Sequence, residues 1–223
     1  MTIEIQVCGF LYLLILVLQI AMAAYGYILD PAPKHYDADA YLPKINNKPK
    51  KFKISMVLAL IEHSSVITLA IMLFIAFGFY SIILGIVWTT FRIAEGSIQV
   101  YIEKDYWGLL NIARQYSGTS GAEKNSLSDS YRSILQTKSS RFGYTMICWS
   151  IGTLALSIVL VTYIVVPLFI GWLGIASSIA VGVINGIKVI KPNYKAYEAL
   201  SSIGGLAAIV FELIIGVWLL FFI

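Results

Sequence analysis

The sequence predicts an all-α protein: an integral membrane bundle of six transmembrane helices in a single domain that covers residues 1–223. Its composition is the first observation, since 59% of the residues are hydrophobic and 13% are charged, against about 45–50% and about 25% in a soluble domain. The second is that the apolar residues form runs of about 20 residues or more, the length that crosses a bilayer. The third is that Lys and Arg lie almost entirely between these runs.

The longest apolar run, residues 55–102, is about twice as long as one crossing requires. We interpret it as two helices joined by a tight turn near Gly78–Tyr80. The expected crossings cover residues 7–28, 55–77, 80–102, 143–166, 168–187 and 199–222. A cleavable signal peptide is the competing interpretation of the first run. Signal peptides begin with basic residues, whereas Glu4 precedes this run and no Lys or Arg does.

Two longer polar segments connect these runs. Residues 29–54 are not expected to form a regular helix, because four prolines interrupt them: Pro31, Pro33, Pro43 and Pro49. Residues 103–141 are expected to be a polar loop. Within it, Tyr106–Arg114 mixes aromatic, aliphatic and basic side chains, which suits a short helix at the membrane interface, and Ser128–Lys138 is a candidate for a second short helix.

The basic residues predict the orientation of the chain. Every Lys and Arg except Arg92 lies in residues 29–54, 103–141 or 188–198. Because cytoplasmic loops of membrane proteins are enriched in Lys and Arg, these three loops are expected in the cytoplasm. Both termini are then expected outside, with the protein in the cell membrane.

A cluster of ionisable residues falls inside the apolar runs: Glu62, His63, Arg92, Glu95 and Glu212. Charged groups at such depths normally face the interior of a bundle and pair with one another. Arg92 reaches Glu95 across a spacing of three residues, and at 1.5 Å per residue Glu62 and Glu95 lie at the same depth, roughly 10 Å. His63 is about 100° around the helix from Glu62, so it is expected to face a different neighbour.

Small residues predict where helices approach closely. Gly174, Ser178, Gly182 and Gly186 recur every fourth position and therefore share one face of a helix. Small residues let membrane helices pack backbone to backbone, so this face is expected to be buried against a neighbour. Aromatic residues near the ends of the runs are expected to form interfacial belts, namely Tyr25, Tyr27, Tyr101, Tyr106, Trp107, Tyr144 and Trp149.

Several segments resemble the prokaryotic DUF4386 multi-pass membrane family. Phe91–Gly96 (Phe-Arg-Ile-Ala-Glu-Gly) is similar to its aromatic-Arg-x-x-Glu-Gly element. Val166-Pro167 followed by Phe169–Ile175 resembles the stretch that opens its fifth span, Phe211–Leu219 resembles its C-terminal Glu and Trp-Leu motif, and Leu60–Glu62 lies where the family carries an acid. The resemblance implies a six-helix membrane protein and does not imply a particular activity.

No motif in the sequence indicates a particular reaction. The sequence contains no hydrolase, nucleotide-binding or redox motif, so no catalytic residue, metal or cofactor is expected, and nothing indicates nucleic acid binding. The expected partners are the lipid bilayer and either other membrane subunits or further copies of the chain. The first expectation is a structural or accessory membrane subunit. The alternatives are a small proton- or ion-linked transporter that uses the buried carboxylates and an intramembrane enzyme. A polar cavity reaching those carboxylates would favour transport.

Overall fold

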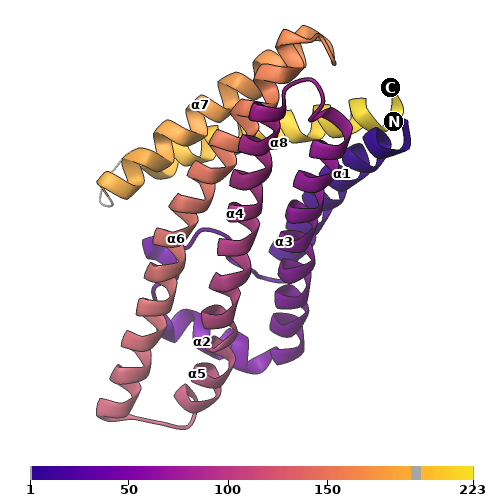
Figure 1. The fold of residues 1–223 in the computed structure, drawn as a ribbon. Coiled ribbons are helices and arrows are strands. Elements are labelled where there is room, and N and C mark those ends of the chain that lie inside the picture. Colours follow the sequence, from indigo (N-terminus) through magenta and orange to yellow (C-terminus); the bar gives the residue numbers. More distant parts are fainter. Residues whose placement is uncertain (1, 192–196, 223) are drawn as a thin grey trace.

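The computed structural model describes residues 2–191 and 197–222, and it is helical nearly throughout (Figure 1). Within these ranges there is no strand. The elements are α1 (Thr2–Ala24), η1 (Pro33–His35), α2 (Ala38–Asn47), α3 (Pro49–Phe77), α4 (Ile82–Trp107), α5 (Leu109–Tyr116), α6 (Gly121–Thr162), α7 (Leu168–Ile190) and α8 (Tyr197–Phe221). The predicted fold class, an all-α membrane bundle, is confirmed.

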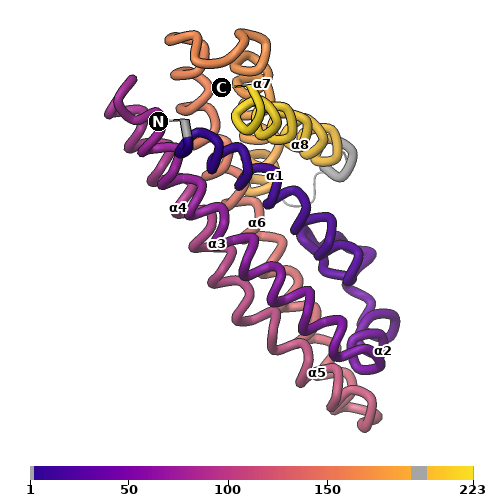
Figure 2. The backbone as a smooth tube through the Cα atoms, turned by 90° about the vertical axis from the view of Figure 1, so that its right-hand side faces the viewer, coloured from indigo at the N-terminus to yellow at the C-terminus, as the bar shows by residue number. Residues whose placement is uncertain are grey.

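The long helices form a closed ring. In the order α1, α3, α4, α6, α7 and α8, each packs against the next, and α8 returns to pack against α1. The first turn of α1 and the last turn of α8 lie at one end of the molecule, together with the α3–α4 and α6–α7 turns (Figure 1). The short helices α2 and α5 lie at the opposite end, which makes the molecule elongated (Figure 2).

Five of these helices are long and apolar enough to cross a membrane: α1, α3, α6, α7 and α8. The helix α4, which carries Arg92 and Glu95, is not among them. The chain is therefore a multi-pass membrane protein by the length and composition of its helices, and the number of six crossings stays a prediction. Residues 192–196, the middle of the expected loop 188–198, lie outside the described residues.

The helix α1 ends at Ala24, four residues before the expected end of the first crossing. Gly26 has a φ of +84°, a conformation that glycine adopts without steric cost. The Tyr27 N–H then bonds the Met22 carbonyl at 3.0 Å, which is the Schellman arrangement that terminates helices. This turn brings Tyr27 into the protein interior, where it is 8% exposed.

The expectation of an irregular segment over residues 29–54 is wrong for its second half. The helix α2 contains Pro43, and α3 begins at Pro49. Pro49 occupies the first helical position, where its missing N–H costs nothing. Asp37 caps the N-terminus of α2, where its carboxylate accepts from the Ala40 N–H at 3.2 Å. Leu42, beside the internal proline, is buried.

The expected polar loop over residues 103–141 is also mostly helical. The helix α4 continues to Trp107, α5 follows, and α6 runs without interruption from Gly121 to Thr162. The candidate helix over Ser128–Lys138 is confirmed as part of α6. Its continuity with the apolar half of α6 was not predicted, because the inward residues of this part are few. They do recur at helical spacing, and they pack against α2, α4 and α5: Leu127, Tyr131, Ile134, Leu135 and Lys138.

A second hydrophobic core holds this end of the molecule together. It is separate from the core of the ring and contains buried side chains from several helices: Met22, Tyr27, Ala38, Leu42, Phe52, Met56, Ala59, Tyr106, Leu109, Leu110, Ala113, Tyr116, Tyr131 and Leu135. The helix α5 thus directs its apolar face into protein, not into lipid as an interfacial helix would. Tyr116 donates to Asp39 at 2.9 Å, and Lys124 donates to the same oxygen at 2.8 Å.

The α7 stripe of small residues faces α6 over most of its length. A methyl group added at Gly174 would meet the Ser157 hydroxyl of α6 and, at 2.6 Å, the Phe211 ring of α8. One added at Gly182 would meet the Ser150 Cβ of α6 at 3.2 Å. Ser178 accepts a hydrogen bond at its carbonyl from the Ser150 hydroxyl. Gly186 differs from the expectation, because no described neighbour lies within 4 Å of the position its Cβ would take.

Candidate functional site

A cavity of about 290 Å³ lies inside the helix ring. Every helix of the ring contributes to its wall. The polar lining residues are Gln19, Asp30, Glu62, Arg92, Glu95, Gln99, Asn185, Ser201, Ser202 and Glu212. Because buried polar groups normally need hydrogen-bond partners, this concentration of polar side chains marks the cavity as the candidate site.

Arg92 is the only Lys or Arg that lines the cavity among the described residues. Its guanidinium forms an ion pair with Glu95 at 2.8 Å and a longer one with Glu212 of α8 at 3.8 Å. Gly152 of α6 makes room for it, because a Cβ at this position would lie 2.9 Å from the Arg92 Cγ. Arg92 thus links α4 to α8 while its aliphatic portion lies against α6.

Trp149 holds the Glu212 carboxylate in place. Its indole N–H donates to Glu212 at 2.8 Å, and both side chains line the cavity. Trp149 is 4% exposed, so the expectation that it belongs to an interfacial belt is wrong. The indole contributes a polar group to the interior of the ring, where a buried Trp N–H normally finds a partner.

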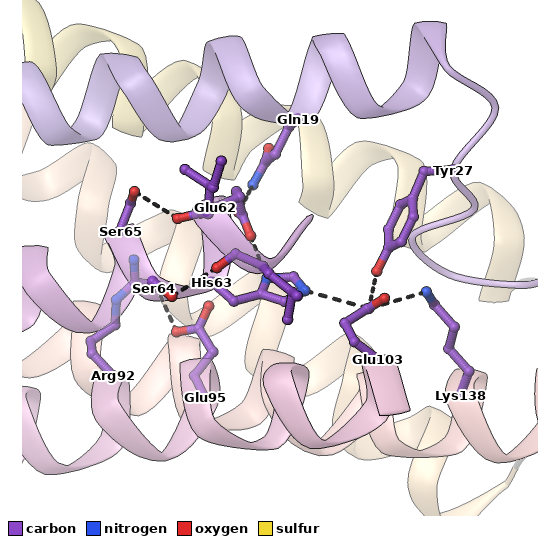
Figure 3. A network of polar contacts seen from close by, with 12 residues as sticks. Gln19, Tyr27, Glu62, His63, Ser64, Ser65, Arg92, Glu95, Glu103 and Lys138 are labelled. Atoms are coloured by element: carbon purple, nitrogen blue, oxygen red, sulfur yellow. Dashed lines mark hydrogen bonds and ion pairs between the residues drawn. The ribbon is translucent and has the colours of Figure 1, made fainter. Parts of the chain in front are cut away.

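Glu62 and His63 form the next part of the cluster (Figure 3). Gln19 of α1 donates to the Glu62 carboxylate at 2.9 Å. The Nδ1 atom of His63 is hydrogen-bonded to the other oxygen of Glu62. The expectation that His63 faces a different neighbour is wrong for Nδ1 and holds for Nε2, which lies 3.5 Å from Glu103 of α4.

Glu103 joins this part of the cluster to a buried lysine. Its carboxylate accepts from the Tyr27 hydroxyl and lies 3.6 Å from the Lys138 ammonium. The same ammonium lies 3.8 Å from the centre of the Tyr27 ring and 3.7 Å from that of Tyr106. Two aromatic faces therefore share in stabilising a lysine that is 3% exposed.

Together these contacts form a continuous polar path along α3 and α4. From the cavity it passes from Glu62 through His63 and Glu103 to Lys138 (Figure 3). Along α4 its residues occupy one face of the helix, at Arg92, Glu95, Gln99 and Glu103. Four carboxylates and a single guanidinium line the cavity among the described residues, so acidic groups are in excess.

The α1–α2 connection closes one side of the cavity. Asp30 lines the cavity and accepts from Lys188 of α7 at 2.8 and 2.9 Å and from Ser139 of α6 at 2.9 Å. A further cavity of about 550 Å³ shares Asp30, Ser201 and Ser202 with the first. These shared residues mark the point at which the ring opens toward the polar segments.

The structure brings the sequence-derived cluster together and adds residues to it. Glu62, Arg92, Glu95 and Glu212 line one cavity, and His63 contacts Glu62 from outside its wall. The residues that were missed are Gln19, Tyr27, Glu103, Lys138 and Trp149. Glu103 follows Glu95 by two helical turns on the same face, a spacing visible in the sequence. The others depend on contacts between distant segments.

Metal binding finds no support in the described part of the chain, where no group of three or more His, Cys, Asp or Glu side chains is arranged to hold an ion.

The model of one protein family matches almost the whole chain. The family described as a domain of unknown function, DUF4386, matches residues 7–222. The chain belongs to the DUF4386 family. No curated protein and no solved structure matches it in the corresponding searches. In this DUF4386 protein the Phe91–Gly96 and Phe211–Leu219 segments supply Arg92, Glu95 and Glu212, so both segments contribute to the cavity.

Proposed function

We propose that this DUF4386 protein is a proton-linked carrier of a small positively charged solute. The observation that supports the proposal is the cavity of about 290 Å³, whose wall carries four carboxylates and one guanidinium. Asp30 pairs with Lys188, which leaves Glu62, Glu95 and Glu212 with Arg92. Ligand cavities are about 300–1,000 Å³, so the volume suits a small molecule. The excess of carboxylates suits a cation, and desolvated carboxylates exchange protons when a cation enters or leaves.

The polar path supplies the proton link. Transporters place chains of Asp, Glu and His within their spans to relay protons. Here the imidazole of His63 stands between Glu62, which lines the cavity, and Glu103, which pairs with Lys138 outside it. Movement of a proton from Glu62 to Glu103 through the two imidazole nitrogens would change the charge of the cavity without opening the ring.

The same proposal includes the orientation and setting of the protein. With the Lys-rich segments in the cytoplasm of a cell membrane, the end that carries α2 and α5 is cytoplasmic. The point where Asp30, Ser201 and Ser202 border two cavities then faces this compartment. Assembly with further copies of the chain or with another membrane subunit belongs to the proposal as well.

A structural role is the second candidate, and the ion pairs of Arg92 favour it. The pairs with Glu95 and Glu212 connect two helices of the ring, which would also suit an accessory subunit. A purely structural cluster predicts that substitutions change stability and leave no ligand-dependent signal.

Trp149 offers a direct test, because its indole lines the cavity and contacts Glu212. In protein reconstituted into liposomes, we expect small cations such as methylammonium or guanidinium to change tryptophan fluorescence, and the change to disappear in Trp149→Phe. Uptake driven by a proton gradient should fall by about tenfold or more in Glu62→Gln and Glu212→Gln. Glu123→Gln, at the exposed start of α6, is the matched control. Folded wild-type protein without cation-dependent fluorescence or uptake would refute the carrier.

A further inference from the structure

A second cavity, of about 360 Å³, lies in a different part of the molecule. It is formed where the end of α1, the helix α2 and the start of α3 meet the second hydrophobic core. Its inner wall is aromatic and aliphatic, with Phe52, Tyr106, Leu109 and Tyr131. Its rim carries three lysines, Lys44, Lys48 and Lys51. The cavity is thus apolar inside and basic at its entrance.

The three lysines have no acidic partner among the described residues. None of them forms an ion pair with a described carboxylate, although Lys124 and Lys188 do. The Lys44 ammonium lies 4.7 Å from the centre of the Tyr41 ring, and that of Lys51 lies 5.9 Å from the Tyr25 ring. Three exposed positive charges thus border one cavity and lack a negative group between them.

Helix α3 adds a further positive contribution. The side chains of Lys48 and Lys51 flank its first turn, which begins at Pro49. The N–H groups of a first helical turn have no partner within the helix, and the helix dipole favours an anion there. The basic rim and the start of α3 therefore both favour the binding of an anion at the entrance of the cavity.

The apolar surface of α3 begins directly beyond the rim. Ile54 and Ile61 are 44% and 46% exposed, and they follow Lys51 by three and ten residues, which keeps them near one face of the helix. Because α3 is one of the helices apolar enough to cross a membrane, its exposed isoleucines face lipid. The lysines lie where such a helix leaves the hydrocarbon, at the level of phospholipid headgroups.

From this arrangement we propose that the cavity binds an anionic phospholipid. Lys44, Lys48 and Lys51 hold the phosphate and its headgroup at the entrance, and the acyl chains lie against the aromatic inner wall and along the exposed apolar face of α3. A soluble phosphate would use the same lysines and would have no use for the aromatic inner wall or for the adjoining isoleucines. The site goes beyond the proposed carrier function and does not depend on it, since its residues and those of the helix ring cavity are different.

The test compares two triple variants of equal charge. Lys44→Gln/Lys48→Gln/Lys51→Gln removes the rim, whereas Lys34→Gln/Lys50→Gln/Lys53→Gln removes three lysines of the same segment that do not line the cavity. Purified protein in detergent is titrated with phosphatidylglycerol or phosphatidylcholine, and bound lipid is counted by native mass spectrometry. Inorganic phosphate and glycerol phosphate form separate arms. All proteins are checked for native helicity and elution volume.

We expect wild type and the control triple to retain phosphatidylglycerol in preference to phosphatidylcholine. The rim triple should lose at least about fivefold in affinity for phosphatidylglycerol, because lysines near an anionic headgroup attract it electrostatically. Equal losses in the two triples would show general electrostatic attraction and overturn the site. Competition by inorganic phosphate at similar concentration would assign the lysines to a soluble anion instead. Should the triple misfold, the single variant Lys48→Gln, whose side chain is exposed, gives the same comparison with Lys50→Gln.

Discussion

At the scale of single residues, the buried pair of Glu103 and Lys138 is the part of the polar path in which a substitution is expected to cost the most stability. Both side chains are 3% exposed, and the ammonium is surrounded by a carboxylate and two tyrosine rings. Burying a charge without a partner costs several kcal/mol, so removing one member of a buried pair costs more than the pair contributes. The pair therefore constrains which substitutions the chain tolerates.

Lys138→Met is expected to lower the free energy of unfolding by about 3–5 kcal/mol, because it leaves Glu103 buried without its cation. The double variant Lys138→Met/Glu103→Gln should recover part of this loss. Denaturant titration in detergent measures both. As a control, Lys124→Met breaks the exposed pair with Asp39 and should cost far less stability, because water screens an exposed pair. Equal losses in the two single variants would contradict the assigned burial.

Asp39, on α2 outside the membrane-spanning helices, predicts a dependence on pH. Hydrogen bonds from Lys124 and Tyr116 hold the pKa of this carboxyl below its usual range. Since the folded-state pKa is depressed, its stabilising effect is present above the unfolded pKa and is lost as the pH falls through the folded value. Wild type should therefore be more stable than Asp39→Asn above about pH 5, and the difference in melting temperature should shrink steadily on acidification. A difference that does not change with pH would argue against these bonds.

At the scale of helices, spacing within one segment was predictable and contacts between segments were not. The pairing of Arg92 with Glu95 follows from their separation of three residues, and the turn near Gly78 follows from the length of the apolar run. Trp149 resembles a belt aromatic in sequence, and only the closure of the helix ring brings its indole within hydrogen-bond distance of Glu212 of α8. The second core escaped prediction because each of its helices contributes few apolar residues.

The α7 stripe gives a prediction at this scale. Gly174→Ala should destabilise the fold by about 1–3 kcal/mol, because the added methyl meets the Phe211 ring and the Ser157 hydroxyl. Gly186→Ala should be neutral or stabilising by up to about 1 kcal/mol, because its Cβ enters open space and alanine favours a helix. Thermal unfolding of both variants in the same detergent compares them. Equal changes in stability would contradict the assignment of Gly174 as a packed position and Gly186 as an open one.

At the scale of the whole molecule, the two ends of the ring differ in character. One end has short turns and few charges, and the other has a second core and most of the basic residues. The distribution of Lys and Arg in the sequence predicted this difference between the two ends. The number of six crossings stays a prediction, because α4 combines an apolar length with charges that line the cavity.

The orientation is tested with single cysteines in a Cys8→Ala/Cys148→Ala background. A membrane-impermeant maleimide added outside intact cells should label Phe79→Cys, which lies in the α3–α4 turn and is exposed. Lys48→Cys should react only after the membrane is permeabilised, because its segment is expected in the cytoplasm. Reversed labelling would place the termini in the cytoplasm.

The closure of the ring by α8 against α1 has a consequence for biosynthesis. Helices emerge from the ribosome in chain order, so Arg92 enters the membrane long before the Glu212 carboxylate that it contacts has been translated. During that interval the nascent bundle has a gap between its first and most recent helices, and lipid or an insertion chaperone must occupy it. Premature termination before α8 would leave this gap permanently open, which gives quality-control proteases a feature by which to distinguish unfinished chains from finished ones.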